Sequence, residues 1–302
     1  MKNLFHKQLF IYLLSIVFIF IGCSHSSQFS KKPDKTCLVL SVGGVKGIAH
    51  IGAIDALKKL NIKIDCVYGN SAGSLVGALY SFDPKSNLKK ESKKLLSEYL
   101  EKTEKDKFGS ARRGFIFGSI LTFISGGIFG WETIISSTVL GWNDVDEINL
   151  KRTENILNKY FYKQNIEDLS IEFATGYQEI NENGIVMKTA SKGNLSSAIS
   201  KSISNPLIFN ENVKQMKYFD PGSDRVAATP IFDAIQHFKP TKVIAINVTS
   251  ESAIYFEIKN VEVIEIMVNA VDSSENEVRD FSQLIEKNYN IGYNTVIKFL
   301  EE

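Results

Sequence analysis

The sequence predicts an α/β protein, a three-layer α/β/α sandwich with a mostly parallel central sheet. Apolar runs of strand length alternate with stretches in which apolar residues recur at helical spacing. The first such unit runs from Thr36–Val42 into Ile48–Leu60, and the second runs from Ile64–Tyr68 into Ala72–Phe82. Because a crossover, usually a helix, must join two parallel strands, this alternation predicts a parallel sheet whose functional loops follow the carboxyl ends of its strands.

The second half of the chain supplies the remaining elements of the sheet. We expect strands at Ile171–Ile180 and Ile185–Thr189 joined by a turn at Asn181–Gly184, two buried strands at Thr241–Val248 and Val261–Val268, and a terminal helix over Glu275–Glu302.

The composition is that of one globular unit. The chain has 302 residues, of which 44% are hydrophobic, and its formal net charge is +1. This balance lacks the basic surplus of nucleic-acid-binding proteins, so no nucleic-acid partner is expected. No His/Cys cluster has metal-ligand spacing, and we expect no metal and no other cofactor.

A candidate nucleophile lies between the second expected strand and its helix. Gly69-Asn70-Ser71-Ala72-Gly73 fits the pattern G-x-S-x-G, and the strand-to-helix context is the one that this pattern needs. The small residues Gly69 and Gly73 let the chain turn sharply, so that the Ser71 hydroxyl projects from the turn. On its own the pattern is weak, because five residues with three fixed recur by chance.

A glycine loop follows the first expected strand. Its sequence is Gly43-Gly44-Val45-Lys46-Gly47, and such a loop can aim backbone N–H groups at an anion. A dinucleotide fingerprint would need glycine at Val42, and a phosphate loop would need Ser or Thr where the chain has Gly47 and Ile48. We therefore expect an oxyanion hole for the serine on the neighbouring strand; the alternative is a plain tight turn.

Together these motifs resemble those of the patatin-like phospholipases. The resemblance is most specific over Leu38–Tyr80, which holds both motifs in order with a similar helix between them. Weaker matches follow at Asn194–Phe209 and Tyr218–Gly222. The resemblance covers roughly residues 36–235, which we take as the patatin-like domain, with residues 236–302 completing it.

The resemblance implies a lipid acyl hydrolase that works through a Ser–Asp dyad without histidine. Ser71 would be the nucleophile, Asp220 the proton acceptor, and the amides of Gly43 and Gly44 the oxyanion hole. The expected substrate is a phospholipid or another acyl lipid. An aspartate near its usual pKa of about 3.9 is a poor base for a serine, so we expect an apolar pocket to raise the pKa of Asp220.

Three positions depart from the family pattern: Val42, Asn70 and Pro221. Pro221 restricts Asp220 to an extended backbone, a change that could move its carboxylate. Asp224 is then the competing acid. The departures also leave open a catalytically inactive lipid-binding protein.

Histidine offers a third hypothesis, a Ser-His-Asp esterase that uses His237. This residue follows the candidate acid in the chain, as in α/β-hydrolases. Its position near a helix end has a structural explanation, since the helix dipole favours a histidine there. His50 is expected to be a packed residue of the first helix.

The amino terminus resembles a bacterial lipoprotein signal. Lys2 and Lys7 precede the uncharged run Leu9–Ile21, and Gly22-Cys23 follows. We expect a signal peptide over residues 1–22, lipidation of Cys23, a flexible tether over residues 23–35, and a lipid-anchored protein of the cell envelope. An uncleaved membrane anchor is the alternative.

Two further features concern the folded part of the chain. Cys37 and Cys66 lie in neighbouring expected strands, and we expect buried free thiols, with a disulfide as the alternative. Residues 114–131 contain no charge and five glycines, which favours an apolar lid or an interfacial segment that contacts a membrane surface. Ordinary core packing and a membrane span remain the other possibilities for this segment.

Overall fold

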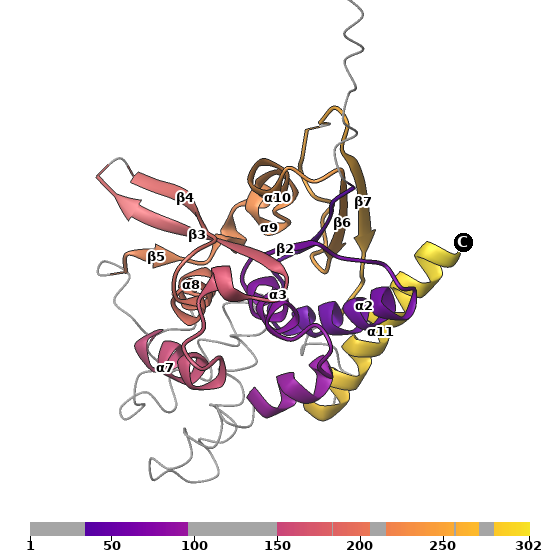
Figure 1. Ribbon diagram of the computed structural model, residues 1–302, viewed down its shortest axis with the longest axis horizontal. Helices are drawn as coiled ribbons and strands as arrows, with labels where there is room; N and C mark the ends of the chain where they lie inside the picture. The colour runs from indigo at the N-terminus through magenta and orange to yellow at the C-terminus, as the bar shows by residue number, and fades with distance from the viewer. Residues whose placement is uncertain (1–33, 96–149, 183, 206–215, 257, 272–280) are drawn as a thin grey trace, which may run out of the picture. The chain divides into compact units, whose positions relative to one another are not determined.

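The computed structural model describes residues 34–95, 150–182, 184–205, 216–256, 258–271 and 281–302. These residues form a mixed, mostly parallel sheet with helices on both faces (Figure 1). The order of its strands is β4-β3-β2-β1-β6-β7, and β5 pairs with β3 outside this path. The predicted α/β fold with a mostly parallel sheet is confirmed. Cys23 and the segment 114–131 lie outside the described residues.

The elements have the following bounds. The strands are β1 (Thr36–Leu40), β2 (Cys66–Gly69), β3 (Glu172–Asn181), β4 (Gly184–Ala190), β5 (Tyr218–Phe219), β6 (Lys242–Asn247) and β7 (Glu262–Met267). The α-helices are α2 (Ile48–Lys59), α3 (Ala72–Phe82), α7 (Leu150–Tyr160), α8 (Leu195–Ser202), α9 (Arg225–Ala228), α10 (Ile231–Phe238) and α11 (Phe281–Glu301). Short 3-10 helices are η1 (Gly44–Gly47), η2 (Ile166–Asp168) and η4 (Pro221–Ser223).

The central strands are apolar because helices cover both of their faces. Alternate residues of β1 point to opposite sides: Leu38 and Leu40 belong to the large core that includes α2, α3 and α11, whereas Val39 packs in a smaller core with α10. Figure 1 shows α10 on one side of these strands and α2, α3 and α11 on the other. Among the described residues, no helix is both long enough and apolar enough to cross a membrane.

Helix α11 supports α2 through two glycines. A Cβ atom on Gly52 would collide with the backbone of Tyr289, and one on Gly292 would collide with the backbone of Ala49. The two helices can approach this closely only because both positions lack a side chain. Since α2 follows the glycine loop directly, α11 supports that loop from behind.

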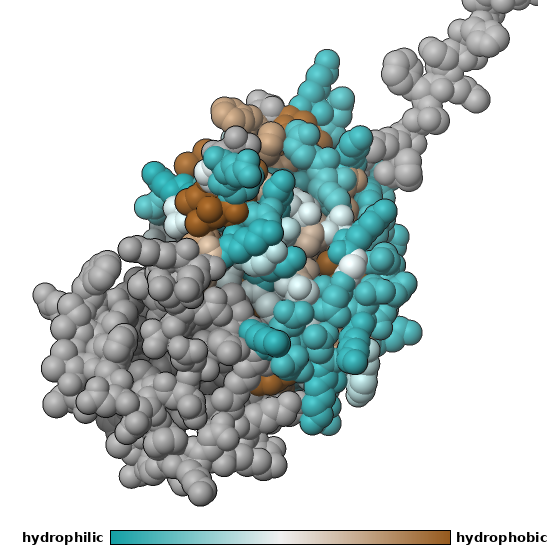
Figure 2. Space-filling model, turned by 90° about the vertical axis from the view of Figure 1, so that its left-hand side faces the viewer, coloured by the Kyte–Doolittle hydropathy of each residue, from teal (hydrophilic) through white to brown (hydrophobic). Residues whose placement is uncertain are grey.

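Strand β3 is longer than its parallel neighbour. It pairs with β2 through Thr175 and then continues into an antiparallel hairpin with β4, which projects to the left in Figure 1. Ile180 and Ile185 are direct partners across this hairpin and are 40% and 64% exposed. Figure 2 views the molecule from this side and shows hydrophobic patches on a largely hydrophilic surface.

The prediction of two free thiols is wrong, because Cys37 and Cys66 form a disulfide. They are direct partners across the parallel strands β1 and β2, and their Cα atoms lie 4.6 Å apart, within the range that a disulfide spans. The sequence placed them in adjacent strands but did not fix the register, on which the pairing depends.

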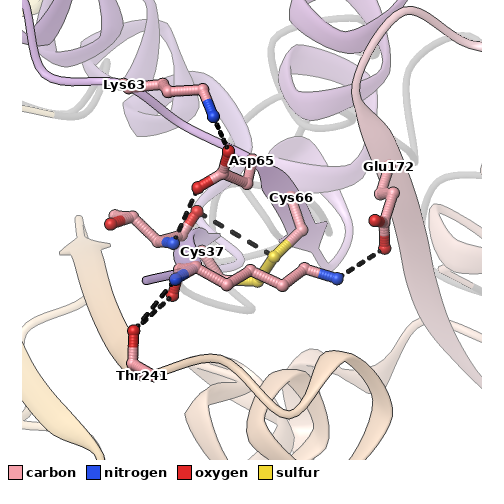
Figure 3. A network of polar contacts seen from close by, with 8 residues as sticks. Cys37, Lys63, Asp65, Cys66, Glu172 and Thr241 are labelled. Carbon is pink, nitrogen blue, oxygen red and sulfur yellow. Dashed lines mark hydrogen bonds and ion pairs between the residues drawn. A yellow bond between two sulfur atoms is a disulfide. The ribbon is translucent and has the colours of Figure 1, made fainter. Parts of the chain in front are cut away.

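Polar contacts join the amino ends of the strands around this disulfide (Figure 3). The Lys35 ammonium contacts Glu172 of β3 at 2.7 Å, and the Lys35 backbone N–H donates to the Thr241 hydroxyl at 2.9 Å. The Asp65 carboxylate accepts the Thr36 N–H at 3.0 Å. These contacts hold the end of the sheet opposite to the loops that contain the candidate site.

Candidate active site

A cavity of about 610 Å³ lies at the carboxyl ends of the strands. Its lining comes from the loop after β1, the turn after β2, the β3–β4 hairpin, the segment from β5 to α9, and the loop after β6. Among the sequence-predicted residues, Gly43, Lys46, Ser71 and Asp220 all line it. The structure therefore brings together Gly43 and Asp220, which are 177 positions apart in the sequence.

Ser71 occupies a strained turn at the start of α3. Its φ is 51° and its ψ is −121°, a combination that non-glycine residues rarely adopt. Its carbonyl accepts hydrogen bonds from the Ser74 N–H at 2.9 Å and the Ser74 hydroxyl at 2.7 Å. Gly73 lets α3 approach β1, since a Cβ atom there would meet the Leu40 carbonyl. This geometry is the predicted elbow, with Ser71 only 5% exposed.

The glycine loop turns directly beneath this cavity. Gly44 has a φ of 55° and begins η1, so its N–H has no partner inside that helix. Gly43 packs so closely against Val248 that any Cβ atom would collide with that side chain. The Val45 carbonyl accepts a hydrogen bond at 3.5 Å from the buried amide of Asn288 on α11. The loop is thus fixed from two sides, with Gly43 facing the cavity.

Asp220 keeps its place in the cavity despite Pro221. Its backbone is extended, with φ −58° and ψ 128°, and its carboxylate accepts the Gly222 N–H at 2.8 Å. Burial raises the pKa of Asp220 to about 6, while hydrogen bonds from the Ser71 side chain and the Gly222 amide act in the opposite direction. The carboxyl and the Ser71 hydroxyl are therefore hydrogen-bonded in surroundings that disfavour charge.

The end of α8 and the residues just after it contact both Ser71 and Asp220. The Ser202 hydroxyl accepts the backbone N–H of Ser71 at 3.0 Å. The Ser204 carbonyl accepts the backbone N–H of Asp220 at 2.9 Å. Sequence reasoning noted only a weak match to the family over Asn194–Phe209 and missed these contacts. Their signal was the cluster of serines in a helix with a buried face.

Asn70 is a second residue whose role the sequence did not indicate. Its side chain is fully buried and bridges two segments: its carbonyl oxygen accepts the Gly176 N–H of β3, and its Nδ2 donates to the Ala227 carbonyl of α9, both at 2.8 Å. The amide therefore ties the elbow to a strand and to the helix that follows Asp220. It had been singled out only as a departure from the family pattern.

The competing acid and the two histidines take other positions. Asp224 caps α9 by accepting the Val226 N–H at 2.9 Å, and it is not among the residues that line the cavity. His237 lies near the end of α10 with its ring 4.7 Å from that of Phe238, also outside the cavity lining. His50 is buried, and its Nε2 donates to the Ser41 carbonyl at 3.0 Å. The described residues thus contain no serine–histidine pair in this cavity.

Within the described part of the chain, no group of three or more His, Cys, Asp or Glu residues could hold a metal ion. The chemistry available to the cavity is that of a hydroxyl, a carboxyl with a raised pKa, and backbone amides. This set is the one that acyl transfer to a serine requires.

Comparison with known proteins identifies the class. The family model described as patatin-like phospholipase matches residues 38–235, and the chain therefore belongs to this family of serine acyl hydrolases. The chain is 47% identical over 62 residues to the lysophospholipase NTE1 of Mycosarcoma maydis, a match covering 19% of this chain and 3% of that protein. For the lysophospholipase NTE1 of Coccidioides immitis (strain RS), the identity is 56% over 46 residues, covering 15% and 3%.

The matched segments are thus a small part of these curated relatives.

Among solved structures, VipD from Legionella pneumophila has 12% sequence identity and a TM-score of 0.42, with 89% of this chain and 67% of that chain covered. Full-length ExoU of Pseudomonas aeruginosa in complex with SpcU has 14% identity and a TM-score of 0.36, with 89% and 53% covered. Likenesses this distant carry no argument about the site.

Proposed function

We propose that this protein is a membrane-associated lipid acyl hydrolase of the phospholipase A or lysophospholipase type, with Ser71 as nucleophile and Asp220 as proton acceptor. One observation carries the proposal: the Ser71 hydroxyl is hydrogen-bonded to a carboxyl whose pKa is raised to about 6, inside a cavity bordered by the glycine loop. A base of this pKa is largely ionised at neutral pH and is stronger than an ordinary aspartate.

The proposed reaction has two stages. As the Ser71 oxygen attacks the ester carbonyl, its proton passes to Asp220, and the amides of Gly43 and Gly44 stabilise the negative oxygen of the tetrahedral intermediate. The proton then passes to the leaving alcohol, which leaves an acyl-serine. Water then attacks this acyl group while Asp220 accepts a proton from it. The bond between the acyl carbon and the Ser71 oxygen breaks, the proton passes from Asp220 back to Ser71, and the free fatty acid departs.

The apolar part of the cavity supports an acyl-lipid substrate. Val42, Phe219 and Ile185 line it beside the candidate dyad. Ile185 is also 64% exposed and has the exposed Ile180 as its cross-strand partner. Apolar side chains that continue from the cavity onto the surface of the hairpin suit an enzyme that takes its substrate from a membrane surface.

We further propose that the protein is anchored in a bacterial cell envelope through lipidated Cys23. The support is the order of charged, apolar and Gly-Cys segments in the sequence, together with the Cys37–Cys66 disulfide, since disulfides persist in oxidising compartments. Mass spectrometry of the mature amino terminus tests this. An unmodified Cys23 with residues 1–22 still attached would favour a simple membrane anchor.

The experiment that tests the activity compares wild type with Ser71→Ala, using a fluorophosphonate probe and the release of fatty acid from phospholipid. We expect both signals to disappear in the variant. Ser250→Ala is the matched control, because Ser250 also lines the cavity and its loss should leave both signals. Labelling and turnover at the wild-type level in Ser71→Ala would contradict the assignment. A wild-type protein that shows neither signal would favour the inactive lipid-binding alternative.

A further inference from the structure

The charged side chains at the cavity include an exposed ion pair. Arg225 of α9 and Glu251 of the loop after β6 both line the cavity and contact each other through their charged ends. Their side chains are 69% and 60% exposed. The proposed reaction uses neither residue, and neither is part of the serine or glycine motifs.

The backbones that hold these two side chains are well fixed. Arg225 begins α9, which Asp224 caps through the Val226 N–H at 2.9 Å. The Glu251 carbonyl accepts hydrogen bonds at 2.8 Å from both Asn247 and Thr249. The two charged ends therefore extend from rigid positions and can exchange partners without movement of the fold.

An exposed pair of this kind is weak. Solvent screens it, and comparable pairs contribute about 0–1 kcal/mol. Arginine binds a phosphate more strongly, because its planar guanidinium can donate two parallel hydrogen bonds to phosphate oxygens. An incoming phosphate at the cavity would therefore displace Glu251 from Arg225 at little cost.

We propose that Arg225 binds the phosphodiester of a glycerophospholipid or lysophospholipid substrate, and that Glu251 holds the guanidinium at the cavity until this phosphate replaces it. The inference rests on the proposed hydrolase function and adds the residue that recognises the phosphate of the substrate. In such lipids a single glycerol unit joins the acyl ester to the phosphate, so an ester at Ser71 and a phosphate at Arg225 suit one cavity of about 610 Å³. Lys46, on the same lining, adds a second positive charge.

The test compares a lysophospholipid with a neutral monoacylglycerol that carries the same acyl chain. We expect Arg225→Gln to lower kcat/KM for the lysophospholipid by about tenfold or more, the loss typical of a hydrogen bond between charged groups. Hydrolysis of the monoacylglycerol should stay within about twofold of wild type. Arg225→Lys keeps the charge but not the planar fork, so its kcat/KM for the lysophospholipid should lie between those of wild type and Arg225→Gln.

Two further variants make the comparison sharper. Glu251→Gln should lower KM for the lysophospholipid by up to about fivefold, because Arg225 loses its competitor. Lys242→Gln is the matched control. Lys242 also forms an ion pair, with Glu262 at 3.2 Å, but at the amino end of β6, so its loss should change kcat/KM for neither substrate. If Arg225→Gln lowers kcat/KM equally for both substrates, or for neither, the inference is wrong.

A binding measurement separates this inference from the proposed function. In the Ser71→Ala background, the Arg225→Gln change should weaken the binding of dodecylphosphocholine by about tenfold and leave dodecyl maltoside unchanged. An equal effect on both amphiphiles would overturn the role of Arg225 even in an active enzyme. Conversely, a wild-type protein that binds dodecylphosphocholine through Arg225 but hydrolyses no lipid would contradict the proposed function alone.

Discussion

The side-chain amide of Asn70 donates a hydrogen bond to the Ala227 carbonyl at 2.8 Å, although the two residues are 157 positions apart. Because Asn70 immediately precedes Ser71 and Ala227 lies soon after Asp220, this contact links the backbone segments that carry the two candidate catalytic residues. The same amide accepts the Gly176 N–H. One side chain therefore fixes three segments at the edge of the cavity.

Replacement of Asn70 by alanine should reduce both stability and turnover. The variant leaves the Gly176 N–H and the Ala227 carbonyl without a partner, and each such loss costs about 1–3 kcal/mol. We expect urea unfolding to show this destabilisation, and kcat to fall by more than KM rises. Asn70→Asp keeps an acceptor for Gly176 but loses the donor to Ala227, and it should also be impaired. A variant that is less stable but retains wild-type kcat would make Asn70 purely structural.

The dyad predicts a particular pattern of mutant activities. If Asp220 takes the proton from Ser71 directly, Asp220→Asn should abolish activity about as completely as Ser71→Ala, and the double variant should be no worse. His237→Ala should leave most activity, because His237 is not among the residues lining the cavity. Steady-state kinetics of the four variants decide the matter. A loss of several orders of magnitude in His237→Ala would instead indicate a triad.

The raised pKa of Asp220 predicts the pH dependence of activity. The carboxylate must be ionised to accept a proton, so kcat/KM should rise with pH through about 6, the pKa that burial gives this group. An ordinary aspartate would place this rise in kcat/KM near its usual pKa of about 3.9. His237→Ala is the control and should leave the rise near pH 6 unchanged. If the rise disappears in this control, it reports the histidine and not Asp220.

His50 predicts a loss of stability in acid. Burial lowers its pKa from 6.5 to about 4, so between these values the unfolded chain binds a proton that the folded chain does not. The free energy of unfolding should therefore be highest above pH 6.5 and fall as the pH drops toward 4, by roughly 2–4 kcal/mol from this group. Urea unfolding across this range measures the effect.

Asp220 acts in the opposite direction over part of the same range, because its folded pKa lies above its unfolded value of 3.8. The cleanest measurement thus compares Asp220→Asn with the double variant Asp220→Asn/His50→Gln. The acid dependence assigned to His50 should be present in the first and absent in the second. An unchanged slope in the double variant would contradict the assignment.

Local patterns predicted the elements that hold the candidate nucleophile. The helix expected over Ala72–Phe82 has the same bounds in the structure, because its small and apolar residues and the preceding elbow define it within one stretch of chain. The strand–loop–helix unit around Gly43 and Gly44 also forms as expected. By contrast, β5 contains only two residues and forms through pairing with β3, so no periodicity could indicate it.

The supports of the site could not be predicted, because they depend on contacts between distant segments. The Ser71 N–H donates to the Ser202 hydroxyl across 131 positions, and the cluster of serines around Ser202 does not indicate which residue it contacts. The prediction of free thiols at Cys37 and Cys66 was wrong for a related reason, since strand register is set by the whole sheet. The sequence thus indicated which residues could react, whereas the structure shows what holds them in place.

The disulfide between Cys37 and Cys66 also closes part of the chain into a covalent ring. These residues are 29 positions apart, and the rest of β1, the glycine loop and α2 lie between them. Hydrolysis of any one peptide bond inside the ring would leave both pieces of the protein attached to each other. A protease cut beside Gly43 or Gly44 would therefore add the mass of one water and release no fragment until a reductant opened the ring.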